Sequence, residues 1–294
     1  MGTPAPAEAG SGVVRVQVPE RSFRHDLRVV KIVLHRELIR FWHDKMRIVS
    51  TLVQPVLWLL VMGTGLSNLM ASGGPSGEID LKTFIFPGVC AMSVMFTAMF
   101  SAGSIVWDRE FGFLREMLVA PVSRSAIVVG KCVSGATVAT LQGLLIVMLA
   151  GLAGVPYDPL LLLEMIGIMF LGAFALTGFG VIMAARIKTM QSFFALMQMA
   201  MMPMMFLSGA LYPLNGLPTW LSVLTRINPL TYAVDPLRQV VFAHLDVSAE
   251  LEKTFNPGVT WNGWVVPVWL ELLIIVALGP ILTAVAIWEF RRGD

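Results

Sequence analysis

The sequence contains little charge. Only 14% of its 294 residues are Asp, Glu, Lys or Arg, whereas 56% are hydrophobic. A soluble domain of this size needs more polar side chains to cover its surface, so the composition argues against a soluble protein and favours a membrane protein. The net charge is only +2 and no patch suited to nucleic acid is present. We therefore expect the lipid bilayer, and not nucleic acid, as the partner of most of this chain.

The sequence also has few metal-binding or redox-active side chains. Its two cysteines, Cys90 and Cys132, lie in apolar stretches without a CxxC motif or a neighbouring histidine. We interpret both as structural thiols and not as disulfide or metal ligands. The four histidines lack the spacing of a metal site, so no metal is predicted.

The common catalytic and nucleotide-binding motifs are missing. Gly130-Lys131 is followed by Cys132 and lacks the earlier glycine of a GxxxxGK[ST] phosphate loop, and neither HExxH nor GxSxG occurs. We therefore expect that this chain is not an enzyme by itself and binds no cofactor. The apolar segments also carry almost no charge at their centres, which argues against an ion-coupled carrier.

Six runs free of Asp, Glu, Lys and Arg are long enough to cross a bilayer, which takes about 20 residues of helix. They are Ile48–Gly77, Thr83–Trp107, Cys132–Tyr157, Met165–Ala185, Thr189–Thr225 and Leu272–Trp288. The sequence thus predicts an all-α integral membrane protein with six transmembrane helices in residues 48–290. Placing both termini in the cytoplasm puts 17 of the 21 Lys and Arg residues on the inner side, as the positive-inside rule requires.

The segments outside these runs differ in character. Residues 1–21 are rich in Ala, Gly, Pro and Glu and are predicted to form a disordered cytoplasmic tail. In residues 22–47, Leu27, Val30, Leu34, Leu38 and Phe41 recur at spacings of three and four, which predicts an amphipathic helix lying in the inner interface. The outer loop, residues 212–264, contains two short amphipathic pieces, Pro218–Ile227 and Leu230–His244. Residues 291–294 form a short cytoplasmic tail.

Small residues recur on one face of the predicted third span. Gly135, Ala139, Gly143 and Gly151 are spaced by four residues or a multiple of four. Such a face allows two helices to approach closely. The neighbouring helix can belong to the same chain or to a second copy, and packing within the chain is the simpler interpretation.

A cytoplasmic stretch after the second span combines charged and large apolar side chains. Residues 107–131 read WDREFGFLREMLVAPVSRSAIVVGK, in which Phe111, Leu114 and Leu118 share a helical face and Pro121 ends it. This half-apolar helix is suited to docking into a groove of a partner protein. A plain interfacial loop would show the same periodicity.

This stretch resembles the signature loop of the permeases of type-2 ATP-binding-cassette (ABC) exporters, in which a Gly-Xaa-Leu-Xaa-Glu core precedes a closing Gly-Lys. Phe113 stands where the family more often has Thr. Further motifs in the family's order are Gln54-Pro55-Val56-Leu57-Trp58, Ser208-Gly209-Ala210-Leu211-Tyr212-Pro213 and Asn228-Pro229-Leu230-Thr231-Tyr232. The first of these is similar to the drug-resistance and nodulation-export branch.

The resemblance implies a role and a set of docking residues. The chain would be the permease subunit of an exporter that moves an amphiphilic drug, lipid or glycoconjugate out through the inner membrane of a prokaryote. It would pair with a second permease copy and with an ABC ATPase subunit that holds ATP and Mg, and short re-entrant helices would follow the fifth span. The coupling helix, within a cytoplasmic loop over residues 108–131, would comprise Asp108, Arg109, Glu110, Phe111, Gly112, Phe113, Leu114, Arg115 and Glu116.

Four residues near the predicted outer boundary are candidates for contact with departing cargo. They are Glu164, Glu271, Tyr212 and Asn228. For the two carboxylates, a solvated position in the interface is the simpler interpretation. An ATP-independent channel or carrier, or a scaffold subunit that transports nothing, remains an alternative to the exporter.

Overall fold

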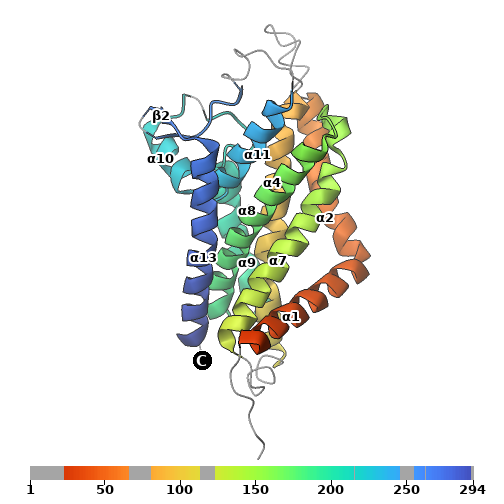
Figure 1. The fold of residues 1–294 in the computed structure, drawn as a ribbon, viewed down its shortest axis with the longest axis vertical. Helices are drawn as coiled ribbons and strands as arrows, with labels where there is room; N and C mark the ends of the chain where they lie inside the picture. Colours follow the sequence, from red (N-terminus) through yellow and green to blue (C-terminus); the bar gives the residue numbers. More distant parts are fainter. Residues whose placement is uncertain are drawn as a thin grey trace, which may run out of the picture.

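A computed structural model describes residues 23–65, 81–112, 123–214, 216–245, 255–261 and 263–292. Figure 1 shows a bundle of long helices with short helices and a small hairpin at one end. Helix α1 (Phe23–His43) begins and helix α13 (Val268–Arg292) ends at the opposite end, which we call the inner end. The predicted disordered tail, residues 1–21, lies outside the described residues.

The described secondary structure is almost entirely helical, which confirms the predicted all-α membrane fold. In chain order the elements are α1 (Phe23–His43), α2 (Lys45–Leu57), the π-helix η1 (Trp58–Met62), α4 (Leu81–Ser101), α5 (Gly103–Glu110), α7 (Arg124–Val147), the 3-10 helix η2 (Ala150–Ala153), α8 (Pro159–Arg186), α9 (Met190–Phe206), α10 (Thr219–Ile227), α11 (Thr231–Ala243), β1 (Thr260–Trp261), β2 (Trp264–Val265) and α13 (Val268–Arg292). The two strands pair antiparallel.

Five segments of the described chain are long and apolar enough to cross a membrane. They are Ile48–Gly65, Leu81–Glu110, Arg124–Val147, Pro159–Arg186 and Val268–Phe290. The predicted fifth span, Thr189–Thr225, forms α9 only as far as Phe206, and its 17 residues extend roughly 26 Å. The count of six spans therefore stays a prediction.

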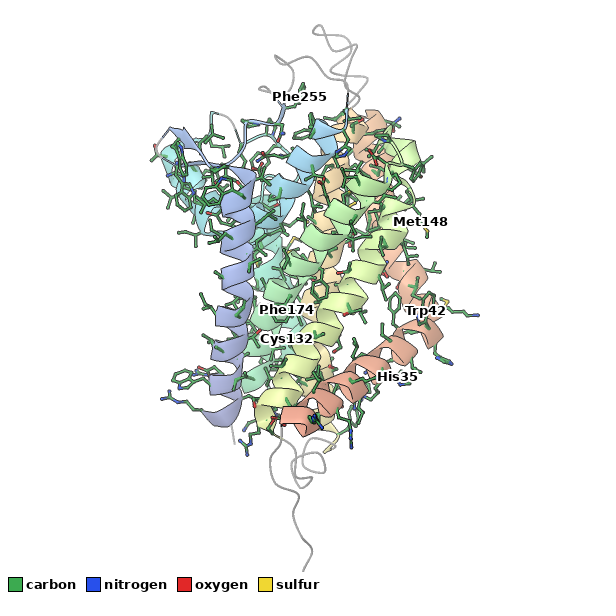
Figure 2. The ribbon with its side chains drawn as sticks, viewed as in Figure 1. His35, Trp42, Cys132, Met148, Phe174 and Phe255 are labelled. Atoms are coloured by element: carbon green, nitrogen blue, oxygen red, sulfur yellow. The ribbon has the colours of Figure 1, made fainter. Side chains whose placement is uncertain are left out.

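The centre of the bundle is formed by α4, α7 and α8. Both cysteines lie in this core as free thiols, and Figure 2 shows Cys132 and Phe174 between the helices. On α7, Gly135 contacts Thr177 of α8 and Ser101 of α4, and Gly143 lies against Met169 of α8. At these two positions the small-residue face therefore serves packing within the chain.

The N-terminal helix α1 crosses the bundle obliquely near its inner end (Figure 1) and packs along α7. Gly130 allows this approach, because a side chain there would meet Val30 and Val33. Of the predicted apolar stripe, Phe41 is buried, whereas Leu27 is largely exposed. The buried face of α1 is set by its contact with α7, and the interfacial position of this helix stays a prediction.

The outer end carries the two short helices that the sequence predicts between the last two spans. The observed bounds of α10 and α11 differ by one residue at most from the predicted pieces. The hairpin of β1 and β2, which was not predicted, follows α11, and Gly263 adopts a positive φ of 86° in its turn. These elements lie at the end of the bundle opposite the start of α1 and the end of α13 (Figure 1).

We predict that Gly88→Ala destabilises the fold by about 1–3 kcal/mol, the usual range for overpacking. A Cβ atom at Gly88 of α4 would lie 2.9 Å from the Cα and carbonyl carbon of Ala210, and backbone atoms cannot move aside cheaply. Thermal unfolding in detergent measures the effect. Gly167→Ala on α8 is the control, because its new methyl group meets no atom within 4 Å. Equal stability of the two variants would contradict the close approach.

Candidate cargo cavity and coupling cluster

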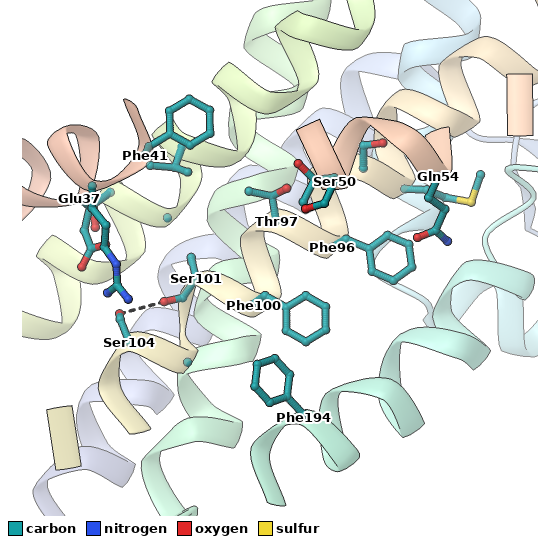
Figure 3. Close-up of a pocket in the computed structure, with 18 of the residues that line it drawn as sticks. Glu37, Phe41, Ser50, Gln54, Phe96, Thr97, Phe100, Ser101, Ser104 and Phe194 are labelled. Atoms are coloured by element: carbon teal, nitrogen blue, oxygen red, sulfur yellow. Dashed lines mark hydrogen bonds between the residues drawn. The ribbon is translucent and has the colours of Figure 1, made fainter. Parts of the chain in front are cut away.

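A cavity of about 490 Å³ opens between α2, α4, α7 and α9, near the ends of α1 and α5. Seven lining residues carry a hydroxyl group: Ser50, Thr51, Ser93, Thr97, Ser101, Ser104 and Ser134. Six are aromatic: Phe41, Trp58, Phe96, Phe100, Trp107 and Phe194. Three are charged: Glu37, Arg40 and Lys131. Figure 3 shows Thr97 beside Ser50, the rings of Phe96, Phe100 and Phe194 together, and Phe41 apart from them near Glu37. The cavity thus combines a hydroxyl-rich side with an aromatic side.

The hydroxyl groups that α4 and α5 contribute to the cavity differ in whether they already make a hydrogen bond. Ser101 and Ser104 donate to backbone carbonyl oxygens of their own turns, at 2.7 and 2.9 Å. Ser93 and Thr97 are 4% and 5% exposed, and their hydroxyl oxygens have no hydrogen-bond partner in the described part of the chain. A buried hydroxyl without a partner is unfavourable, so these two are available to a bound molecule or to water.

The aromatic side supplies apolar contact. The rings of Phe100 on α4 and Phe194 on α9 lie 5.5 Å apart and tilted. Tilted ring pairs at this distance are favourable and present flat apolar faces. The cavity can therefore accept a molecule with an apolar part and a hydrogen-bonding part.

The inner wall of the cavity contains a buried ion cluster centred on Lys131. This side chain of α7 is 4% exposed, and its Nζ lies 3.0 Å from Glu37 of α1 and 3.5 Å from Asp108 of α5. It also donates to the Ser104 hydroxyl at 2.7 Å. Arg36 approaches the same two carboxylates, at 3.3 and 3.7 Å. The cluster joins α1, α5 and α7.

The electrostatics of this cluster favour the ionised carboxylate of Glu37. Burial alone would raise the pKa of this carboxyl group. The Lys131 ammonium group and two nearby arginines outweigh that effect, so the pKa of Glu37 lies below its ordinary value.

The last turn of α5 is bonded to two further helices. Arg109 donates to the carbonyl oxygens of Ala184 and Ile187 at the C-terminal end of α8, at 3.2 and 2.7 Å. Glu110 accepts a hydrogen bond from the backbone N–H of Met190 at the start of α9, at 2.9 Å. A cation at a helix C-terminus and an anion at a helix N-terminus both complement the helix dipole.

The predicted coupling helix is only partly helical. Asp108, Arg109 and Glu110 end α5, and Gly112 has a φ of +83°, which an α-helix does not accommodate. A continuous helix over residues 108–116 was therefore wrong at Phe111 and Gly112. Phe113, Leu114, Arg115 and Glu116 lie outside the described residues. The next helix, α7, already begins at Arg124, which places Lys131 on a helix and not in a loop.

Phe111, which follows α5 directly, has an exposed apolar side chain, at 57% exposure. Its ring lies 4.6 Å from that of Trp107, one turn earlier, which is also exposed. The two rings form a small aromatic surface at the inner end of the bundle. This surface is directly attached to the bonded turn of α5.

No hydrogen bond or ion pair of the described residues joins any two of the four outer candidates. Glu164 is exposed on α8. Asn228 is buried, and both ends of its amide bind backbone, donating to Met204 at 2.7 Å and accepting from Leu230 at 3.0 Å. Tyr212 is half-buried in the segment after α9, where burial raises the pKa of its phenol. Glu271 is fully buried in the first turn of α13.

The cavity residues were missed from the sequence although a signal was present. Ser93, Thr97, Ser101 and Ser104 recur at spacings of four, four and three, which places four hydroxyl groups on one face of the second span. A polar stripe on a membrane helix indicates a face turned away from lipid.

Comparison with known proteins identifies relatives over most of the chain. The sequence model of the family described as "ABC-2 type transporter" matches residues 28–242. The putative transport permease ycf38 of Cyanophora paradoxa is 28% identical over 216 residues, which are 70% of this chain and 72% of that protein. The probable multidrug ABC transporter permease YbhR of Escherichia coli K12 is 31% identical over 228 residues, which are 77% of this chain and 57% of YbhR. Nodulation protein J of Rhizobium leguminosarum bv. viciae is 28% identical over 193 residues, 65% of this chain and 73% of that protein.

We predict that Lys131→Met lowers the free energy of unfolding by about 3 kcal/mol, because it leaves two carboxylates facing each other without their buried cation. Adding Glu37→Gln should recover part of this loss, since it removes one of those charges. Lys188→Met, which alters an exposed lysine after α8, is the control. Unfolding in detergent measures all three variants.

The same ion pair predicts a pH dependence in the unmodified chain. Because the pKa of Glu37 is lowered in the folded state, its stabilising contribution is full above about pH 4.3 and is lost as the pH falls below that value. The Lys131→Met variant tests the cluster itself: if its free energy of unfolding equals that of the unmodified chain, the cluster does not hold α1 to α7.

Proposed function

Because this chain belongs to the ABC-2 type transporter family, we propose that it is the membrane subunit of an ATP-driven exporter whose energy comes from a separate ATPase subunit. The chain is a transport permease of the multi-pass membrane type. One observation supports the proposal that an ATPase subunit drives this chain. The exposed rings of Trp107 and Phe111 lie at the last turn of α5, and this turn makes ion pairs or hydrogen bonds with α1, α7, α8 and α9.

The ion pairs and hydrogen bonds of that turn would allow a bound partner that moves the turn to move several helices with it. Asp108, Arg109 and Glu110 each reach a different part of the bundle, so the turn cannot move without moving the inner ends of several helices. A partner that binds Phe111 and Trp107 would act on all of these helices together. We propose that the ATPase subunit docks on these two rings and on the residues that follow them.

The cargo site we propose is the cavity between α2, α4, α7 and α9. Ser104, Trp107 and Lys131 line it and also belong to the bonded region around α5. A displacement of α5 would therefore change the cavity wall directly. This shared wall supports a coupling between ATPase docking and cargo binding.

The chemistry of the cavity supports an amphiphilic cargo moved outward. Of the three charged lining residues, Lys131 and Glu37 pair with each other and Arg40 is exposed. The two buried lining hydroxyl groups without a partner in the described chain, those of Ser93 and Thr97, are neutral. Relatives named as a multidrug permease and as a nodulation protein agree with such cargo. We further propose pairing with a second permease copy and residence in the inner membrane of a prokaryote.

We predict that Phe111→Arg weakens association with the ATPase subunit by about 30-fold, the effect of losing an aromatic contact worth about 2 kcal/mol. The measurement is co-purification in mild detergent with ATP hydrolysis by the complex. Leu152→Arg is a matched control, because Leu152 is equally exposed, at 57%, in η2. Figure 2 labels Met148, which follows α7 at the outer end of the bundle, so Leu152 lies at the end opposite Phe111.

The outcomes of that experiment separate the candidate functions. Normal assembly and hydrolysis with Phe111→Arg would contradict docking at this ring. Purification of the unmodified chain without any ATPase subunit, in lipid and with ATP present, would favour the channel or scaffold alternatives instead.

We predict that Ser93→Ala combined with Thr97→Val weakens binding of a sugar-headed fluorescent amphiphile by about tenfold, because two hydrogen bonds of roughly 0.7 kcal/mol each are lost. Binding of an analogue without the sugar should not change. Thr140→Val is the control, since the Thr140 hydroxyl donates to the Ala136 carbonyl at 2.8 Å and does not line the cavity. Unchanged affinity for the sugar-headed probe would place cargo elsewhere.

A further inference from the structure

Two buried carboxyl groups meet near the outer end of the bundle. Glu271, in the first turn of α13, is 0% exposed, and Asp235 of α11 is 2% exposed. Their side chains lie within hydrogen-bonding reach of each other. Neither carboxyl oxygen of Glu271 accepts a hydrogen bond from any donor in the described ranges.

The two carboxyl groups differ in their other contacts. Asp235 Oδ2 accepts hydrogen bonds from Gln239 Nε2 at 2.7 Å and from the backbone N–H of Val259 at 3.2 Å. Asp235 is thus held as an acceptor, which suits the ionised form. Glu271 has no such donors around it.

The charges near the pair leave one carboxyl group uncompensated. Arg238, one turn beyond Asp235 on α11, is buried, donates to the Gly209 carbonyl at 2.7 Å and lies 4.2 Å over the ring of Phe84. Burial lowers the pKa of Arg238 to about 10, which still leaves it charged at neutral pH. This one cation can balance the charge of Asp235 but not that of Glu271 as well.

Two further ionisable groups lie nearby on α10 and α11. Tyr232 is close to Glu271, and its hydroxyl group donates to the backbone carbonyl of Arg226 at 2.7 Å. The Arg226 side chain, at the end of α10, is half-buried. Tyr232 is neutral at physiological pH and its hydrogen is already donated to Arg226, so it does not neutralise Glu271.

We propose that Asp235 and Glu271 bind one proton between them and that this shared proton fastens α11 to α13. Two carboxylates in contact in a buried site repel, whereas a carboxyl group that donates to a carboxylate forms a short, charge-assisted hydrogen bond. The proton resides on Glu271 and Asp235 accepts it. This proton-binding site is independent of the ATPase and of the cargo cavity.

The shared proton makes the contact between α11 and α13 depend on pH. When the proton leaves to water, the O–H bond breaks and a second negative charge remains in the buried site. The packed state holds a proton that separated carboxyl groups would release at neutral pH, so the contact is strongest at low pH and weakens as the pH rises. Opening of the outer end, which separates the two helices, would release the proton.

The direct test is infrared spectroscopy of the full-length chain in lipid nanodiscs at pH 7, in which a protonated carboxyl group gives its own C=O stretching band. The expected result is one such band in the unmodified protein and its loss in Glu271→Gln and in Asp235→Asn. Glu164→Gln, which alters an exposed carboxylate, should keep the band. A band that survives in Glu271→Gln would overturn the proposal.

Thermal unfolding between pH 7 and pH 10 provides a second readout in the same samples. The melting temperature of the unmodified chain should fall as the pH rises. Glu271→Gln should flatten this dependence, because its amide donates to Asp235 at every pH. An equal fall in both proteins, or a melting temperature that rises with added Na⁺ or Ca²⁺ at pH 7, would show that the pair holds no proton or holds a metal cation instead.

Discussion

The Lys131 ammonium group lies buried between Glu37, Asp108 and Ser104, where α1, α5 and α7 meet. A buried ammonium group is tolerated only when its hydrogens and its charge are both satisfied, so the three helices must stay in register for the cluster to exist. That register determines where α1 crosses the bundle. It also determines the inner wall of the cavity and the position of the last turn of α5. This ion cluster therefore links the proposed cargo cavity to the surface on which we propose that a partner docks.

The scarcity of charge gives each buried ionisable group a specific place. At the inner end, charges are paired across helices, as in Lys131 with Glu37 and Arg186 with Glu289. At the outer end, Arg238 is bonded to backbone carbonyls and two carboxyl groups lie together. Between these ends the cavity offers hydroxyl groups and rings. Outside its charged inner wall, this neutral polar lining suits a molecule that carries its own apolar part and needs no buried counter-ion.

Charge-free runs and periodicity predicted the approximate positions of the long apolar helices, and α10 and α11 agree with the predicted pieces almost to the residue. The hairpin of β1 and β2 could also have been predicted, because Asn262-Gly263 between two tryptophans is a favoured two-residue turn. Lys131 could not be placed, because its partners Glu37 and Asp108 are distant in sequence and the charge itself suggested a loop. The predicted coupling helix extended too far, because apolar periodicity does not show where a helix ends. The positive φ of Gly112 ends α5.

The segment of α4 and α5 connects the two ends of the molecule. It runs through 30 residues, Leu81–Glu110, or roughly 45 Å if straight, and its regular helical hydrogen bonding is interrupted at Ala102, where hydrogen bonds span three residues instead of four. Glu110 meets α9 at its inner end, Ser93 and Thr97 face the cavity at its middle, and Phe84 lies beneath Arg238 at its outer end. A packed helix transmits a displacement along its axis better than a loop, because its side chains cannot be compressed. A movement imposed beside Phe111 would thus act on the proposed cargo cavity before it reached α11, the helix that carries Asp235. If the protein alternates between two arrangements, the interruption of helical hydrogen bonding at Ala102 is the natural point at which they would differ.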